Sequence, residues 1–329
     1  MASEKKLTKQ VKALLWEKGQ RAVEMARQTV RQEKIPSEQL KEALEYFMSL
    51  WEDVAHPALL ALCCEAVGGK PESTTQVGAA LVLFAGGADV HDDIVDQSTF
   101  KYGKPTVVGK YGGDMALLVG DALLFEGFYA LQAACAPLPA SQRQAIFELV
   151  KEAFFGISSA EAKEASLHGK TGSSVAEEYL EMIKTKAAVG EATAKIGAIL
   201  GGGTAEEVEA LGHYGKTVAV LLTVRDEFID AFELDELKNR AEKECLPLPI
   251  LYALKNPEKA GEIMRLIGKK DIAEEELERL LDLVIDSEET RELKKEMQAM
   301  IREEGKQLQS VKLQGKALKL TLRAMQEDL

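Results

Sequence analysis

The sequence predicts an all-α protein, and two observations support this prediction. Apolar residues recur at helical spacing through most of the 329 residues, and no stretch shows the sustained period-two alternation typical of strands. Hydrophobic residues make up 46% of the chain, which is ample for a large core, and no low-complexity stretch separates its halves. We therefore expect one helical domain over residues 1–329.

Start and stop signals delimit the expected helices. Ser37 is the expected N-cap of one helix, and Ser73 or Thr74 caps the helix that runs into the acidic stretch 91–96. Helical spacing marks, in chain order, residues 11–23, 40–51, 56–66, a stretch from about 113 through 121, 141–169, 175–198, 205–232 and 257–325, with loops at 100–106 and 167–174.

Charge and cysteine content limit the classes of partner. The net charge of −13, from 41 Lys and Arg against 54 Asp and Glu, argues against nucleic acid, because a phosphate-backbone binder needs a basic surface. It does not exclude a phosphorylated small molecule held through metal. The vicinal pair Cys63-Cys64 is expected to be reduced core packing. With no secretory signal and no apolar run of about 18 residues, we expect a cytoplasmic protein without a transmembrane segment.

Two acidic motifs each close an apolar, helical stretch. We call Asp92, Asp93 and Asp96 the first acidic motif, and Asp226, Glu227 and Asp230 the second. Carboxylates at i and i+4 share a helix face, where they repel one another and are costly to bury unless a cation binds. Acidic residues often decorate solvated helix faces, but these follow two of the most apolar runs, 81–88 and 218–224. The pattern therefore predicts Mg²⁺ between two facing helices.

The order and spacing of several motifs resemble the trans-prenyl diphosphate synthase family, over roughly residues 50–254. The matching segments are 91–96, 102–106, 120–124, Lys186, 226–230 and 246–247. The resemblance implies an isoprenoid synthase-type bundle of antiparallel helices around a deep central cavity, usually as a homodimer. It also implies two or three Mg²⁺ ions and an allylic prenyl diphosphate as substrate.

By this resemblance the two acidic motifs hold metal and several lysines hold diphosphate. The implied metal ligands are Asp92, Asp93, Asp96, Asp226, Glu227 and Asp230. The implied catalytic residues are Asp92, Asp96, Lys186 and Asp226, and the implied substrate-binding lysines are Lys101, Lys186 and Lys243. The metal would stabilise the departing pyrophosphate, and the double bond of isopentenyl diphosphate would trap the allylic cation.

Small residues one turn before the first acidic motif are candidates for the pocket wall. In the family, the side chains at the positions of Gly87 and Ala88 project down the cavity. Because both residues are small here, the resemblance implies room for a prenyl chain of about C20 or longer. Glycine here also permits close helix packing, and the sequence leaves both interpretations open. His91 is expected to be a partner for an aspartate and not a metal ligand.

The departures from the family concentrate at one function. Where the family carries Gly-Gly-Lys-Arg-x-Arg-Pro, which clamps isopentenyl diphosphate, residues 51–57 retain only the proline. An Arg-Arg pair after the first motif is replaced by Lys101-Tyr102, and lysine lacks the planar fork of arginine.

Three hypotheses therefore stay open. The first is a polyprenyl diphosphate synthase that condenses the allylic substrate with isopentenyl diphosphate. The second is an enzyme that ionises a prenyl diphosphate and then cyclises it, eliminates a proton as a lyase, or transfers the prenyl chain to another acceptor. The third is a non-catalytic subunit that binds prenyl diphosphate in a heteromeric synthase.

Overall fold

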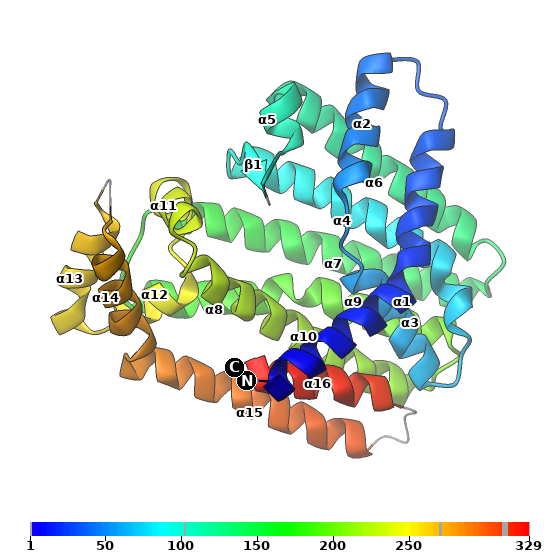
Figure 1. Ribbon diagram of the computed structural model, residues 1–329. Helices are drawn as coiled ribbons and strands as arrows, with labels where there is room; N and C mark the ends of the chain where they lie inside the picture. The colour runs from blue at the N-terminus through cyan, green and yellow to red at the C-terminus, as the bar shows by residue number, and fades with distance from the viewer. Residues whose placement is uncertain (1, 102, 270–271, 311–314, 329) are drawn as a thin grey trace. The chain divides into compact units, whose positions relative to one another are not determined.

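The computed structural model (Figure 1) describes residues 2–101, 103–269, 272–310 and 315–328. Within those ranges the chain is almost entirely helical, which confirms the all-α prediction. The chain divides into two compact units. Unit 1 comprises residues 1–150, 192–212 and 311–320, and unit 2 comprises residues 151–191, 213–310 and 321–329. The expectation of a single domain stays a prediction, and each unit is described by itself.

The elements through residue 167 are α1 (Ala2–Gln32), α2 (Glu38–Leu50), α3 (Ala55–Ala66), the 3₁₀ helix η1 (Pro71–Thr74), α4 (Thr75–Val95), β1 (Phe100–Lys101), β2 (Lys104–Pro105), α5 (Val107–Tyr111), α6 (Gly113–Cys135) and α7 (Ala140–Leu167). The later elements are α8 (Ser173–Lys186), α9 (Ala188–Leu200), α10 (Ala205–Asp230), α11 (Leu234–Lys243), α12 (Leu248–Ala253), α13 (Pro257–Ile267), α14 (Glu274–Ile285), α15 (Glu288–Ser310) and α16 (Lys316–Asp328).

Side-chain caps explain where two of these helices begin. Ser37 has extended backbone geometry and its hydroxyl accepts from the N–H of Leu40 at 3.3 Å, which confirms the predicted N-cap of α2. Thr106 caps α5 in the same way, because its hydroxyl accepts from the N–H of Gly109 at 3.1 Å. That hydroxyl also donates to the carbonyl oxygen of Ser98 at 2.7 Å, so one side chain ties the loop after α4 to the helix that follows.

The core of unit 1 depends on the close packing of α4 against α6, which run side by side in Figure 1. A Cβ added to Gly87 of α4 would lie 2.8 Å from Cγ of Leu124 and 3.0 Å from the carbonyl oxygen of Gly120. A Cβ added to Gly127 of α6 would lie 3.1 Å from a ring carbon of Phe84. Glycine at these positions lets the two backbones approach, and α4 is thereby fixed along most of its length up to the first acidic motif.

Three sequence-based expectations need correction, and three short helices were missed. The helix expected over 175–198 is two helices, α8 and α9, with a break at Ala187. The loop expected over 100–106 contains a small hairpin, with Phe100 paired to Pro105. The hydroxyls of Ser73 and Thr74 do not cap α4 but donate to carbonyl oxygens within η1 and just before it. The helices α5, α11 and α12 were not expected, because short helices carry too few residues for their period to show.

Candidate active site

The first acidic motif lies at the C-terminal end of α4 in unit 1. Asp92 is half-buried, and Asp93 is buried with 3% of its surface exposed. Asp96 follows the last residue of the helix, and its N–H donates to the carbonyl oxygen of Asp92 at 2.9 Å. Asp92 and Asp96 therefore lie one turn apart, whereas Asp93 is rotated by about 100° around the helix and faces the interior.

Lys101 is the cation of this cluster. Its Nζ lies 2.6 Å from Oδ1 of Asp93, 3.4 Å from Oδ1 of Asp89 and 3.9 Å from Oδ2 of Asp92. Burial raises the pKa of Asp93 to about 6, and Lys101 opposes that rise. Burial also disfavours the charge on Lys101, but Asp89 and Asp93 outweigh it and raise the pKa of the lysine. The acidic neighbours of Lys101 therefore favour its protonated form, and its role in binding diphosphate stays a prediction. Tyr102 lies outside the described residues.

The imidazole of His91 lies close to an aspartate on the neighbouring helix, without a hydrogen bond to its Nε2 among the described residues. Its Nε2 lies 3.3 Å from Oδ1 of Asp121 on α6. A Cβ added to Gly120 would lie 2.3 Å from the same nitrogen, so the imidazole occupies the space that the glycine leaves. The structure thus places His91 beside Asp121, which follows that glycine in the motif Gly120-Asp121, and the expectation that His91 supports an aspartate of the metal site stays a prediction.

The second acidic motif lies at the C-terminal end of α10 in unit 2. Asp226 is exposed, and its Oδ1 lies 3.5 Å from Nη1 of Arg225. Asp230 is half-buried. Glu227 is buried, with 6% of its surface exposed, and its Oε2 accepts from the N–H of Leu248 at 2.7 Å. As in the first motif, the residue at i+1 turns inward while the residues at i and i+4 keep contact with solvent.

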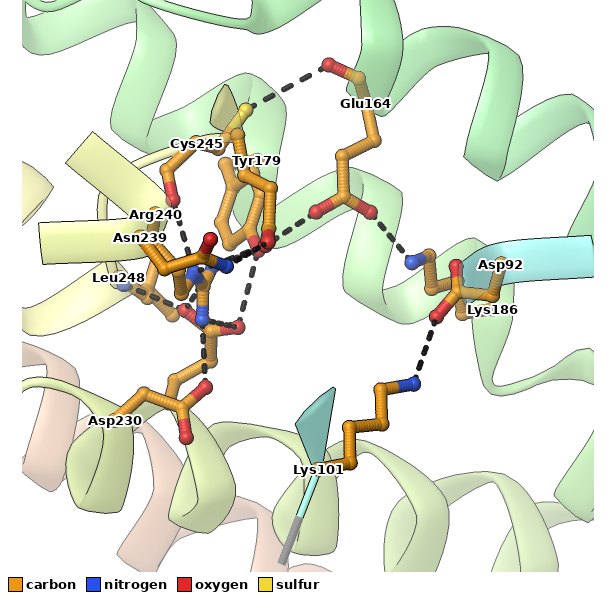
Figure 2. A network of polar contacts seen from close by, with 12 residues as sticks. Asp92, Lys101, Glu164, Tyr179, Lys186, Asp230, Asn239, Arg240, Cys245 and Leu248 are labelled. Carbon is orange, nitrogen blue, oxygen red and sulfur yellow. Dashed lines mark hydrogen bonds and ion pairs between the residues drawn. The ribbon is translucent and has the colours of Figure 1, made fainter. Parts of the chain in front are cut away.

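Arg240 binds the buried glutamate, and sequence reasoning missed it (Figure 2). Only 4% of Arg240 is exposed. Its Nη1 donates to Oε1 of Glu227 at 3.0 Å and to Oδ2 of Asp230 at 2.8 Å. Its Nε donates to the carbonyl oxygen of Cys245 at 2.9 Å. Despite the cost of burial, Glu227 raises the pKa of Arg240 well above its usual value, so the guanidinium stays charged.

A tyrosine continues this network to the predicted diphosphate lysine. Nη2 of Arg240 donates to Oη of Tyr179 at 2.6 Å. That Oη lies 3.0 Å from Oε1 of Glu227 and 3.1 Å from Oε1 of Glu164. The other oxygen of Glu164 accepts from Nζ of Lys186, which ends α8 (Figure 2). Within unit 2 the structure thus brings together Asp230 and Lys186, two residues predicted from different motifs.

Lys186 is held between two glutamates. Its Nζ pairs with Oε2 of Glu164 and lies 2.8 Å from Oε1 of Glu161. Burial opposes its charge, but the two glutamates raise its pKa, so the lysine is protonated. Lys243, by contrast, is exposed at the last position of α11, and its role in binding diphosphate stays a prediction.

Gly87 and Ala88 differ in the structure. Gly87 is buried and packs against Leu124 and Gly120 of α6, so the close-packing interpretation applies to it. The contacts favour the close-packing interpretation for Gly87, and its place in the wall of a substrate pocket stays a prediction. Ala88 is half-buried and remains the candidate for the pocket wall.

In the described part of the chain, no group of three or more His, Cys, Asp or Glu side chains is arranged so that it could hold a metal ion by itself. The two acidic motifs belong to different units, and the expectation that they face one another stays a prediction. None of the described helices is both long and apolar enough to cross a membrane.

A helical chain with two acidic motifs at helix ends and half-buried lysines paired with carboxylates fits the class of prenyl diphosphate enzymes. The sequence model of the polyprenyl synthetase family matches residues 37–284, and the chain belongs to that family. The predicted family and the predicted class, a trans-prenyltransferase of the polyprenyl diphosphate synthase type, are therefore confirmed.

Individual relatives agree with this assignment. The chain is 33% identical over 224 residues to a short chain isoprenyl diphosphate synthase of Methanothermobacter thermautotrophicus, a match that covers 65% of each protein. It is 33% identical over 239 residues to the chloroplastic geranylgeranyl pyrophosphate synthase 11 of Arabidopsis thaliana, covering 69% of this chain and 67% of the relative. The matches thus span about two thirds of the length of these relatives.

The fold also matches solved structures. The geranylgeranyl pyrophosphate synthetase of Pyrococcus horikoshii superposes with a TM-score of 0.84 at 23% identity, covering 97% of this chain and 98% of that one. A polyprenyl synthetase of Streptomyces coelicolor superposes with a TM-score of 0.81 at 20% identity, covering 96% and 99%. At these identities the likeness shows the fold, and it confirms the predicted isoprenoid synthase-type helical bundle.

Proposed function

We propose that this protein ionises an allylic prenyl diphosphate with Mg²⁺ and condenses the resulting allylic cation with isopentenyl diphosphate. One observation supports the proposal most directly. In each unit a half-buried lysine pairs with carboxylates: Lys101 with Asp93 in unit 1, and Lys186 with Glu161 and Glu164 in unit 2. A site that is acidic overall but keeps charged lysines suits a diphosphate that arrives with its metal.

The residues of both motifs fit magnesium. Mg²⁺ prefers carboxylate oxygens and keeps several waters, so its ligands must be accessible to solvent. Asp92, Asp96 and Asp230 are half-buried and Asp226 is exposed. We therefore propose these four carboxylates as the metal-holding residues, in a protein that binds two or three ions. When bound, the metal would act as a Lewis acid that stabilises the leaving pyrophosphate.

The chain's own residues carry the remaining steps. The ammonium groups of Lys101 and Lys186 would donate to diphosphate oxygens and favour loss of the leaving group, because each adds a positive charge where negative charge develops. Apolar side chains of α4 before the first motif would shield the allylic cation from water. Ala88 would set the depth available to the prenyl chain, which we propose reaches about C20 or longer.

A second candidate function has its own observation in unit 1. Residues 51–57 replace the family's isopentenyl diphosphate clamp, and their polar groups bond to one another. The indole N–H of Trp51 donates to the carbonyl oxygen of Asp53, and Oδ1 of Asp53 accepts from the N–H of Ala55 at 2.7 Å. The nearby guanidinium of Arg27 donates to the carbonyl oxygens of Met48 and Trp51. Because these groups bond within the protein, they are not directed toward a second diphosphate. The contacts therefore favour transfer of the prenyl chain to an acceptor without a diphosphate, or cyclisation or elimination in place of condensation.

A product assay distinguishes the candidates. Purified protein is incubated with Mg²⁺ and an allylic diphosphate, with and without isopentenyl diphosphate. Longer prenyl diphosphates support condensation, and hydrocarbon or prenol formed without isopentenyl diphosphate supports the second function. Turnover that begins only when another synthase subunit is added supports the third hypothesis, a non-catalytic subunit. No turnover under any of these conditions would refute the proposed reaction.

We also propose that the protein is a homodimer that uses an exposed apolar face of α6. The large apolar side chains exposed along this helix are Leu117, Leu118, Phe125, Phe128 and Tyr129, with Phe125 exposed over 76% of its surface. An apolar face of this kind is typical of a protein interface. Light scattering of wild type and of Phe125→Asp tests it, since the variant should be monomeric.

The four cysteines are free and buried, as expected in the reducing cytoplasm that we propose as the location.

A further inference from the structure

We infer that Arg240 is a positioning residue for the reaction: it fixes Asp230 directly, and through Tyr179 and Glu164 it fixes Lys186. The inference rests on the proposed function, because it assigns Asp230 to metal and Lys186 to diphosphate. Asp230, Arg240, Tyr179, Glu164, Lys186 and Glu227 form what we call the Arg240 network (Figure 2).

The guanidinium of Arg240 is used in a way that lysine cannot reproduce. It donates in three directions: Nε to the carbonyl oxygen of Cys245, Nη1 to Glu227 and Asp230, and Nη2 to Tyr179. Nη2 also lies 3.3 Å from Oε2 of Glu227. A planar fork with five N–H donors satisfies this set, whereas an ammonium is a point charge with three donors. The orientation of Asp230 is thus determined by a buried group that is itself held on three sides.

Tyr179 links Arg240 to Glu164, the carboxylate that pairs with Lys186. A phenol has one hydrogen, and with Arg240 donating to its oxygen, that hydrogen can go to either Glu227 or Glu164. Glu227 already accepts from Arg240 and from the N–H of Leu248. Donation to Glu164 therefore satisfies more groups, and it fixes the carboxylate that holds Lys186.

Lys186 retains donor capacity for a ligand. An ammonium has three N–H donors, and the contacts in unit 2 use Glu161 and Glu164 as acceptors. The third donor can therefore bind a diphosphate oxygen, and its direction depends on where the two glutamates sit. Since Tyr179 holds one of them, loss of the phenol oxygen should loosen the lysine without removing any group that touches the ligand.

The alternative is that the network only stabilises the fold of unit 2. The two roles differ in what they change. A purely structural role lowers the unfolding temperature and leaves ligand affinity per folded molecule intact. A positioning role weakens binding of metal diphosphate in protein that is still folded, because the binding groups are present but misplaced.

Calorimetric titration of the full-length protein with magnesium pyrophosphate tests this, alongside the unfolding temperature of each variant. We expect Tyr179→Phe and Arg240→Lys to raise the Kd about 10-fold while remaining folded. Two matched controls lie elsewhere in unit 2: Tyr252→Phe at another buried tyrosine, and Arg279→Lys at an exposed pair with Glu262. Both controls should bind as wild type does.

The outcomes separate the inference from the function on which it rests. If wild type neither binds magnesium pyrophosphate nor turns over an allylic diphosphate, the proposed function fails and the inference with it. If wild type binds and both network variants keep its Kd, the inference alone is overturned. Should Arg240→Lys fail to fold, Tyr179→Phe decides, because it leaves the pairs of Arg240 with Glu227 and Asp230 in place.

Discussion

Replacing Glu304 with glutamine should stabilise the protein at neutral and higher pH, and the gain should vanish in acid. Glu304 lies in α15 with 3% of its surface exposed. Its Oε2 accepts from the hydroxyl of Thr217 at 3.1 Å, whereas its Oε1 is buried without a hydrogen-bond donor among the described residues. Burial raises the pKa of Glu304 from 4.5 to about 7, with a further contribution from Glu303.

The sign and size of the effect follow from that shift. Above pH 4.5 the unfolded chain releases a proton that the folded chain keeps until about pH 7. The free energy of unfolding therefore falls as pH rises through this window, by about 1.4 kcal/mol per pH unit, and about 3 kcal/mol is lost in total. Glutamine resembles the protonated acid and lacks this loss, so Glu304→Gln should exceed wild type by about 3 kcal/mol at pH 8 and by little at pH 4.5.

Denaturant unfolding followed by circular dichroism at a series of pH values measures this difference. The exposed neighbour provides a matched control, because Glu303→Gln removes a carboxylate that pairs only with Lys306 among its described contacts. Glu303→Gln should show the same fall in stability with rising pH as wild type, made slightly smaller because Glu303 adds to the raised pKa of Glu304. A gap between Glu304→Gln and wild type that stays constant from pH 4.5 to 8 would show that Glu304 does not change its protonation in this window.

Three further predictions follow from packing and from the proposed metal. Gly120→Ala should destabilise the protein by about 1–3 kcal/mol, since its Cβ would collide with His91, whereas Gly113→Ala, with open space around it, should not; thermal unfolding compares them. Ala88→Phe should shorten the product chain, and Gly87→Phe should reduce the yield of folded protein without a defined change in product, as chromatography of the prenyl products would show. Removal of Mg²⁺ with EDTA should abolish turnover and its return should restore it; activity that persists in EDTA would contradict the proposed chemistry.

The sequence predicted what depends on local periodicity. A helix repeats every 3.6 residues, so its apolar stripe and its caps can be identified within one segment, as with Ser37. The break at Ala187 could not be predicted, because no Gly or Pro lies between residues 175 and 189 to mark it. The start of α9 instead packs closely on α10, where a Cβ on Gly190 would lie 2.6 Å from the carbonyl oxygen of Gly215. That contact joins distant segments and leaves no local signal.

The candidate site was predicted only in part, for the same reason. The carboxylates at i and i+4 and Lys186 were identified from motifs, but Arg240 was not. Its partners Glu227 and Tyr179 lie 13 and 61 positions away, and its own segment is so rich in charge that it is typical of a solvated surface. One signal was present: Glu227 follows the apolar run 218–224, and a carboxylate that is buried there needs a cation of its own.

In both acidic motifs two carboxylates reach solvent and one is buried, and this leads to a final prediction. The residues at i and i+4 keep contact with solvent, while the residue at i+1 is buried against a cation of its own unit, Asp93 against Lys101 and Glu227 against Arg240. Helix geometry accounts for this, because i+1 is rotated about 100° from i. We therefore expect the i+1 residue to act as an anchor that orients the helix end.

Matched substitutions in the second motif test this division. Glu227→Gln should lower the free energy of unfolding by about 3 kcal/mol, because it leaves the buried Arg240 short of one charge partner. Asp226→Asn, at an exposed position, should change stability by less than about 0.5 kcal/mol but weaken binding of Mn²⁺, used as a spectroscopic substitute for Mg²⁺. Denaturant unfolding and Mn²⁺ titration of the same two variants measure both quantities. If Glu227→Gln kept full stability and lost the metal as Asp226→Asn does, the glutamate would be a ligand and the anchor interpretation wrong. If Glu227→Gln loses stability and Asp226→Asn loses metal affinity, the buried Glu227 with its partner Arg240 orients the helix end. The outward-facing carboxylates Asp226 and Asp230 then bind the metal.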